Sequence, residues 1–167
     1  MSSHLRTLAR YKAWANERLY DTVARLPSEE LVAKRPIFAG NILRTLNHVH
    51  AMDLVWKAHL QGVPHGFKAR VPDEVPPLAE LTEKQRQTDQ WYVAYADALD
   101  DSSAAETVKF TFIGGGDGAM TRAEMVMHAV THGIYHRGHV TAVLNLLSIQ
   151  PPSTDLPVYV REKGQSR

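Results

Sequence analysis

Two histidines, His132 and His136, lie four residues apart in the segment from residue 121 to 147 and could bind one metal ion. This segment has the pattern of one long helix, because its apolar residues recur on one stripe at helical spacing. Residues four positions apart on a helix are neighbours, about 6 Å apart along the axis, so the two imidazoles can converge on one cation. An imidazole buried without a partner is costly, so a buried pair needs hydrogen bonds or a metal ion.

More histidines lie in the same segment. Nine histidines spread evenly along 167 residues would place fewer than one in a window of twelve, whereas residues 128–139 hold four. His128, His132 and His136 together span about 12 Å of helix axis, too far for all three to bind one ion. His128 lies toward the edge of the apolar stripe, and we expect it in a pocket wall or behind the ligands. The residues of this segment leave two interpretations open: a metal site, or core and surface histidines with other partners.

Four segments with helical periodicity predict the elements that must position this pair. Thr121 and Glu124 form a capping box at the start of the last one, and Asn41 and Gly62 are typical of the two ends of the second. We therefore predict one all-α domain over residues 1–167, an antiparallel four-helix bundle with long crossover loops. The predicted helices cover residues 4–26, 41–61, 78–99 and 121–147.

The segments between these helices differ in character. Residues 63–77 contain four prolines and predict a long surface loop. Residues 107–113 alternate like a strand and precede the glycine cluster at 114–118, which predicts a small β-hairpin before the last helix. A phosphate-binding loop is the alternative, but the lysine and hydroxyl that should follow it are absent. The tail from residue 151 is expected to be extended, packed on the bundle and frayed at Gly164.

A third buried imidazole is expected from the second helix. This helix is apolar around much of its girth, which is typical of a helix between two neighbours. His48 falls on a buried stripe, whereas His50 and His59 are expected at the surface. His48, His132 and His136 would supply three neutral nitrogen ligands and leave one coordination position free, as in catalytic rather than structural sites.

The composition narrows the function classes. Apolar residues at 44% and charged residues at 22% are ordinary for a soluble globular protein, and no apolar run is long enough to span a bilayer. The N-terminus lacks the apolar core of a signal peptide, so a cytoplasmic protein is expected. A net charge of +1 without a basic run argues against nucleic-acid binding. The chain has no cysteine, so any thiol chemistry requires a thiol brought by a substrate.

Four motifs make the chain resemble the DinB/YfiT-like family over nearly its whole length. They are YKAWANERL at residues 11–19, LNHVHAMDLVW at 46–56, HAVTHGIYHRGHV at 128–140 and DLPVYVRE at 155–162. The third motif is the most specific of them. One departure is His139, where the family more usually has glutamine, and this residue could alter a contact to the ligands or the substrate.

The resemblance implies a four-helix bundle, often a homodimer, with a divalent ion on three histidines that match His48, His132 and His136. Structures in the family are associated with nickel or zinc, and manganese or iron would also suit such ligands. Relatives include bacillithiol S-transferases and mycothiol-dependent maleylpyruvate isomerases, in which the metal activates a low-molecular-weight thiol. For this chain the resemblance implies a small-molecule substrate and a metal-dependent transferase or hydrolase.

The polar residues closest to the predicted site are His128, Tyr135, Arg137 and His139, which are candidates for acid–base or anion-binding roles. Each also has a structural interpretation: Tyr135 could cover the core, and Arg137 could pair with a carboxylate of another helix. Asp53, one turn beyond His48, is a candidate partner for the free N–H of a ligand. The alternatives to an enzyme are a bundle in which the metal only staples two helices, or a metal-free dimeric interaction module.

Overall fold

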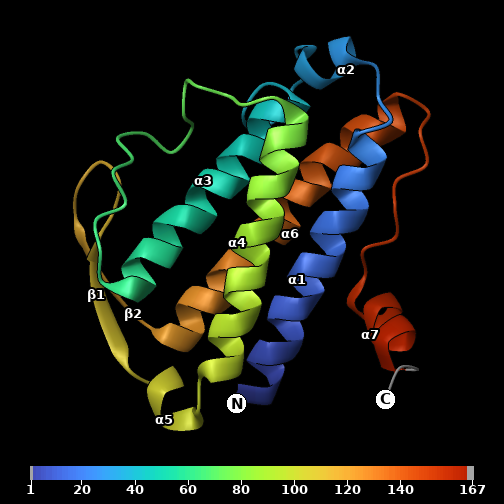
Figure 1. Cartoon of the computed structure of the whole chain (residues 1–167). Coiled ribbons are helices and arrows are strands. Elements are labelled where there is room, and N and C mark those ends of the chain that lie inside the picture. The colour runs from blue at the N-terminus through green and yellow to red at the C-terminus, as the bar shows by residue number, and fades with distance from the viewer. Residues whose placement is uncertain (1, 165–167) are drawn as a thin grey trace.

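Four long helices lie side by side in the computed structural model, which describes residues 2–164 (Figure 1). The first and last run in one direction and the middle two in the other, so the most extensively packed pairs, α1 with α4 and α3 with α6, are antiparallel. The predicted antiparallel four-helix bundle is therefore confirmed. The helices are α1 (Ser2–Val23), α3 (Ile42–Gln61), α4 (Leu78–Ala98) and α6 (Arg122–Leu146).

The helix ends follow the chemistry of their capping residues. The Asn41 side chain accepts a hydrogen bond from the backbone N–H of Arg44 and opens α3, and Gly62 closes it in the left-handed region at φ +70°. Thr121 and Glu124 form the reciprocal capping box that begins α6. Both ends of α3 and the start of α6 therefore lie where the sequence predicts them.

Short elements join these helices. The helical turns α2 (Ser28–Val32) and α5 (Asp101–Ala104) precede α3 and the hairpin, respectively. The predicted hairpin is present, with β1 (Thr107–Thr111) paired antiparallel to β2 (Asp117–Thr121). Residues 63–77 form a loop without regular structure that runs along the bundle from the end of α3 to the start of α4 (Figure 1). None of the described helices is both long and apolar enough to cross a membrane.

The C-terminal tail differs from its prediction. Residues 151–155 have no regular structure, but the chain then forms a short helix, α7 (Leu156–Gly164), against the outer side of α1 (Figure 1). Pro157 in its first turn is compatible with a helix start. The Tyr159 ring lies 5.4 Å from the Trp14 ring, and the Trp14 indole N–H donates to Glu162. These contacts with α1 stabilise a helix that its short sequence pattern did not predict. The predicted fraying concerns residues beyond Gly164, which lie outside the described range.

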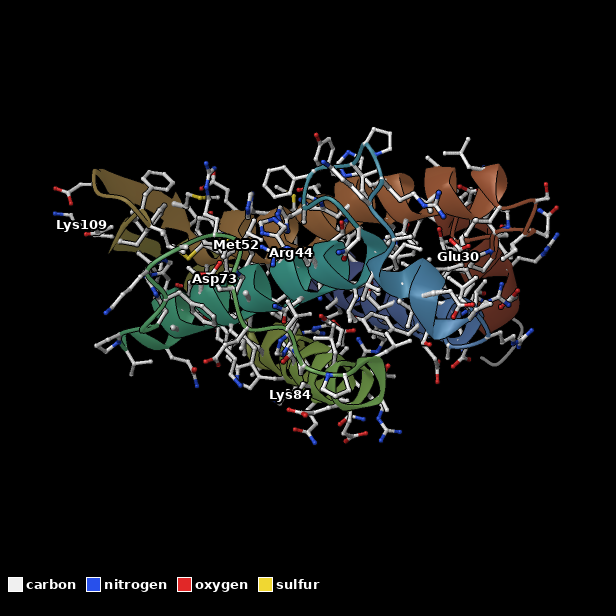
Figure 2. The ribbon with its side chains drawn as sticks, turned by 90° about the horizontal axis from the view of Figure 1, so that it is seen from above. Glu30, Arg44, Met52, Asp73, Lys84 and Lys109 are labelled. Atoms are coloured by element: carbon white, nitrogen blue, oxygen red, sulfur yellow. The ribbon has the colours of Figure 1, made fainter. Side chains whose placement is uncertain are left out.

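The interior has an apolar cluster at each end and a polar layer between them. One cluster lies near the hairpin and includes Met125 and Tyr92, and the other lies near α2 and includes Leu81 and Val140. Figure 2 shows α3 between α4, which carries Lys84, and α6. The polar layer has two parts. The histidine trio, His48, His132 and His136, lies where α3 meets α6. A charged network lies beside α1 and α4.

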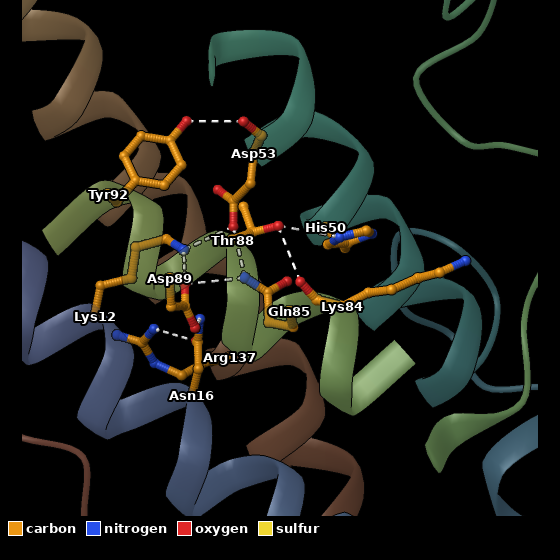
Figure 3. Close-up of polar contacts among 10 residues, drawn as sticks. All are labelled: Lys12, Asn16, His50, Asp53, Lys84, Gln85, Thr88, Asp89, Tyr92 and Arg137. Atoms are coloured by element: carbon orange, nitrogen blue, oxygen red, sulfur yellow. Dashed lines mark hydrogen bonds and ion pairs between the residues drawn. The ribbon is translucent and has the colours of Figure 1, made fainter. Parts of the chain in front are cut away.

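The charged network is centred on Lys12, a fully buried lysine of α1 (Figure 3). Its ammonium group donates to Asp53 of α3 at 2.7 Å and also to Asp89 of α4. The Gln85 amide N–H group donates to both carboxylates, at 2.9 Å to Asp53 and 3.0 Å to Asp89. Burial lowers the pKa of Lys12, but the two carboxylates outweigh it and the pKa is raised above its ordinary value. Lys12 is therefore a permanent cation that joins three helices.

The network continues to the fourth long helix through Asn16. The Asn16 side chain donates to Asp89 at 2.8 Å and accepts from Arg137 of α6 at 3.0 Å. The Arg137 guanidinium also donates to the Tyr11 hydroxyl. Gly133 leaves space for this arrangement, because a Cβ there would lie 3.3 Å from the Arg137 guanidinium. All four long helices are thus linked within one buried layer.

We expect Lys12→Met to lower the free energy of unfolding by about 3–5 kcal/mol, because it leaves two buried carboxylates without their cation. Arg10→Met is the matched control, since Arg10 pairs with Asp97 on the exposed face of the same helix, and it should cost no more than about 1 kcal/mol. Urea unfolding of both variants measures the difference. Equal effects would show that the network contributes nothing specific to the bundle.

Candidate metal centre

Three histidines from two helices meet in the polar layer. His48 points from α3 toward His132 and His136 of α6, and one ring nitrogen of each lies within 4.8 Å of the others. The ring centroids are 5.0 Å apart for His48 and His132, 4.6 Å for His48 and His136, and 4.5 Å for His132 and His136. Within the described part of the chain, this is the one group of three or more His, Asp or Glu residues with the spacing of a metal site. The sequence-predicted trio is therefore brought together.

The orientation of His48 is set by the loop between α3 and α4. Its Nδ1 lies 2.6 Å from the Arg70 carbonyl oxygen, which can only accept, so Nδ1 carries the proton. The other nitrogen, Nε2, then presents a lone pair and lies 3.1 Å from Nε2 of His132. Asp53, the candidate partner for the free N–H of a ligand, instead accepts from Lys12. For His48, the backbone carbonyl of Arg70 takes this role.

The three rings are held in their neutral form. Burial, with smaller contributions from the nearby His48 and His128 rings, lowers the pKa of His132 to about 3. Burial and the neighbouring histidines likewise lower the pKa of His136 to about 3. Burial also lowers the pKa of His48. Since metals bind the neutral imidazole, the site is ready to accept a cation at neutral pH.

His128 lies one turn before the trio, in the wall of the site. Its ring stacks on His132 at 5.7 Å and lies 4.6 Å from the Trp56 ring of α3. The hairpin packs against Trp56 through Phe110, and the centroids of the two rings are 5.1 Å apart. Gly118 opposite Phe110 is required for this packing, since a Cβ there would lie 2.5 Å from the Phe110 ring. His128 thus occupies the wall position expected from its helical phase.

The outer side of the trio is flanked by aromatic rings. Tyr135 is 62% exposed, and its ring lies 4.9 Å from His136 and 4.6 Å from His139. Phe38, which is 51% exposed, lies 4.8 Å from His48 and 5.2 Å from His136. The sequence gives no signal for Phe38, because it comes from an irregular segment between α2 and α3. Its position depends on the path of that segment rather than on any periodicity.

Three other residues considered in the sequence analysis lie outside the trio. Arg137 faces α1 rather than the trio, and its partners are the Asn16 amide oxygen and the Tyr11 hydroxyl, not a carboxylate. His50 is only 8% exposed, so its expected surface position is wrong. It lies about 200° around α3 from His48, on the side that α4 covers, where its Nε2 is 3.3 Å from the Thr88 hydroxyl. His59 is half-buried beside Trp56 and Phe110.

The whole sequence, residues 1–167, matches the DinB family. The chain belongs to the DinB family. Protein DinB from Bacillus subtilis (strain 168) is 24% identical to it over 166 residues, which cover 96% of this chain and 95% of the relative. A DinB-like protein of known crystal structure, from Bacillus cereus ATCC 10987, shares 19% identity and superposes with a TM-score of 0.65 over 86% of this chain and 91% of its own. The second likeness supports the bundle fold of this DinB protein.

Acid should destabilise the metal-free protein between about pH 6.5 and pH 3. In the unfolded chain His132 and His136 take up protons near their ordinary pKa, whereas in the fold they resist protonation until about pH 3. The unfolded state therefore binds more protons in this window, and stability falls as the pH falls. Thermal unfolding at several pH values, with chelator present, measures the slope. The variant His132→Asn/His136→Asn should show a smaller slope, and an unchanged slope would contradict the assignment.

Proposed function

We propose that this DinB protein is a metal-dependent enzyme in which His48, His132 and His136 bind one divalent cation and leave a coordination position for a thiol or water. The observation that supports this most directly is the meeting of three neutral imidazoles without a carboxylate among them. Such a donor set leaves the charge of the cation uncompensated, which favours an anionic fourth ligand. Transfer to a thiol, or hydrolysis, are the reaction classes that fit.

The residues fit a cation at this point. The proton on Nδ1 of His48 leaves its Nε2 lone pair directed at His132, 3.1 Å away. Two ring nitrogens at this distance require a proton or a cation between them, because their lone pairs otherwise repel. A cation also suits all three rings at once, whereas one proton can join only two of them. Imidazole ligands suit zinc or nickel, and manganese or iron are further candidates.

A bound divalent cation would supply a Lewis acid that lowers the pKa of a thiol or water in the open position. The proton released there needs an acceptor, and no carboxylate stands among the described ligands. His139 and Tyr135 are the candidates, because both lie beside His136 on the exposed side. His128 is the candidate on the opposite side of His132. We do not assign Arg137 a catalytic role, because its guanidinium is bound to α1.

The aromatic rings beside the trio favour a substrate with an apolar part. Phe38 and Tyr135 are exposed at positions where their rings also contact His136. Exposed aromatic rings beside a polar centre provide apolar contact area for a ligand at a small entropic cost, and they keep water from part of the site. An electrophile with a flat or apolar group would pack here while its reacting atom meets the nucleophile.

We expect His48→Ala, His132→Ala and His136→Ala each to weaken metal binding by more than about 100-fold. Loss of a residue that only hydrogen-bonds to a metal ligand weakens binding by up to about 100-fold, so loss of a ligand itself should cost more. His59→Ala is the matched control, because His59 lies on α3 but outside the trio. Elemental analysis and competitive chelator titration of untagged protein measure occupancy and affinity. Full occupancy in His132→Ala would show that a different pair of histidines binds the metal.

Cobalt-substituted protein tests the open position. Because the chain contains no cysteine, a sulfur-to-cobalt charge-transfer band after addition of 2-mercaptoethanol can come only from the added thiol. We expect this band, and we expect the zinc or nickel protein to conjugate the same thiol to chlorodinitrobenzene, with formation of the S–C bond and release of chloride. The control is His136→Ala, which should show neither signal.

The same measurements separate the rival functions. If chelation lowers the Tm strongly while no thiol band and no conjugation are found, the metal is a staple between α3 and α6. Protein that contains no metal and cannot be loaded with zinc, nickel or manganese would instead favour an interaction module.

A further inference from the structure

A groove of about 610 Å³ lies on the face of the bundle between α1 and α4, and none of its lining residues belongs to the histidine trio. Four buried polar side chains of these two helices line it, and Trp14 and Tyr159 provide aromatic surface. The groove therefore approaches the charged layer from the side of α1 and α4, whereas the trio lies between α3 and α6. The four polar side chains are Asn16, Tyr20, Gln85 and Asp89.

The amide of Gln85 is held in one orientation by its neighbours. Its NH₂ group donates to Asp53 and to Asp89, so rotation of the amide would place its oxygen against two carboxylates. The carbonyl oxygen Oε1 is thus fixed on the other side of the amide, and it has no hydrogen-bond partner among residues 2–164. Gln85 is only 2% exposed. An unpaired acceptor at this depth is costly, so a donor is expected to occupy the site.

Tyr20 presents a second unpaired group. It is 4% exposed, and its hydroxyl has no partner within the described part of the chain. Burial raises the pKa of Tyr20 well above its ordinary value, and Asp89 and Asp53 raise it further. The hydroxyl therefore stays protonated, and its oxygen can accept a hydrogen bond from an incoming donor.

Charged side chains of both signs line the groove. The basic side chains Arg10 and Arg86 already form ion pairs, with Asp97 and Glu83 respectively, and a third basic residue, Lys163 of α7, also lines the groove. Glu17 and Asp21 also line the groove, and neither has an ion pair among the described residues. An incoming cation thus meets two unpaired carboxylates at the surface and two unpaired oxygens below.

We propose that the groove between α1 and α4 binds a small organic cation with a primary ammonium or guanidinium group. The cationic group donates to the Gln85 carbonyl oxygen and the Tyr20 hydroxyl, and it must enter to the depth of these buried atoms. The apolar part of the ligand packs along Trp14 and Tyr159. This site is separate from the metal centre and does not depend on the proposed enzymatic activity.

Phenethylamine is a suitable probe, with phenethyl alcohol and phenylacetate as neutral and anionic controls of nearly the same shape. We expect calorimetric or NMR titration of the full chain to give saturable binding of the amine, with a Kd on the order of millimolar, as for a fragment of this size. The two controls should bind at least about tenfold more weakly, because they lack the charged donor. The titration is repeated with EDTA and in His132→Ala, where amine binding should persist.

Two buried tyrosines provide a matched pair of variants. Tyr20→Phe should weaken amine binding about tenfold while leaving the Tm unchanged or higher, because the hydroxyl it removes has no partner in the described structure. Tyr92→Phe should lower the Tm and leave amine binding unchanged, because the Tyr92 hydroxyl donates to the Asp53 backbone carbonyl at 2.8 Å and does not line the groove. Asp21→Asn, an exposed change, should weaken binding without loss of stability.

Equal affinities for the amine and the alcohol would overturn the proposal. The same holds if Tyr20→Phe binds the amine as tightly as the wild type does. Loss of amine binding with EDTA or in His132→Ala would place the probe at the histidine trio and would also overturn it. Failure of the metal and thiol experiments, by contrast, leaves this site unaffected.

Discussion

The bundle depends on one buried cation placed between two carboxylates. Lys12 of α1 reaches Asp53 of α3 and Asp89 of α4, and Asn16 extends the contact to Arg137 of α6. A buried charge pair contributes little net stability compared with apolar packing, but it is intolerant of displacement because each group loses its partner if a helix slides. The apolar clusters above and below can accommodate other registers more easily. The charged layer therefore selects one register of the four helices, and this register sets α3 opposite α6 with His48 level with His132 and His136.

Much of this arrangement could be predicted from local sequence rules. The capping residues give the ends of α3 and the start of α6, and helical phase selects His48, His132 and His136 as a converging set. The charged layer also left a signal that helical phase could have revealed. Lys12 lies on the same stripe as Leu5, Leu8, Ala15 and Leu19, and a lysine at a core position requires a buried anion. Asp53 likewise lies on the apolar stripe of α3.

Other features depend on tertiary contacts that no periodicity encodes. His50 is buried only because α4 covers that side of α3, and α7 forms because Trp14 and Arg18 offer it a docking surface. The Arg70 carbonyl that orients His48 belongs to a proline-rich loop whose path no pattern predicts. Phe38 reaches the site in the same way. The three clustered histidines come from regular helices and are predictable, whereas the groups that orient and cover them come from loops and are not.

The division of charge across the polar layer gives the two sides different chemical capacities. On the side of α1 and α4, two carboxylates face two cationic side chains, so the layer is balanced internally. Among the described residues, its acceptors without a partner include the Gln85 and Tyr20 oxygens and one carboxylate oxygen of Asp53. On the side of α3 and α6, the imidazoles are uncharged, and Lys12 contributes to lowering the pKa of His132. A cation bound by the trio would keep its full charge, because no carboxylate belongs to the trio and Oδ2 of Asp53 is bound to Lys12 and Gln85. The network that aligns the helices thus also withholds a neutralising ligand from the site, and an anion from solution would have to complete the coordination.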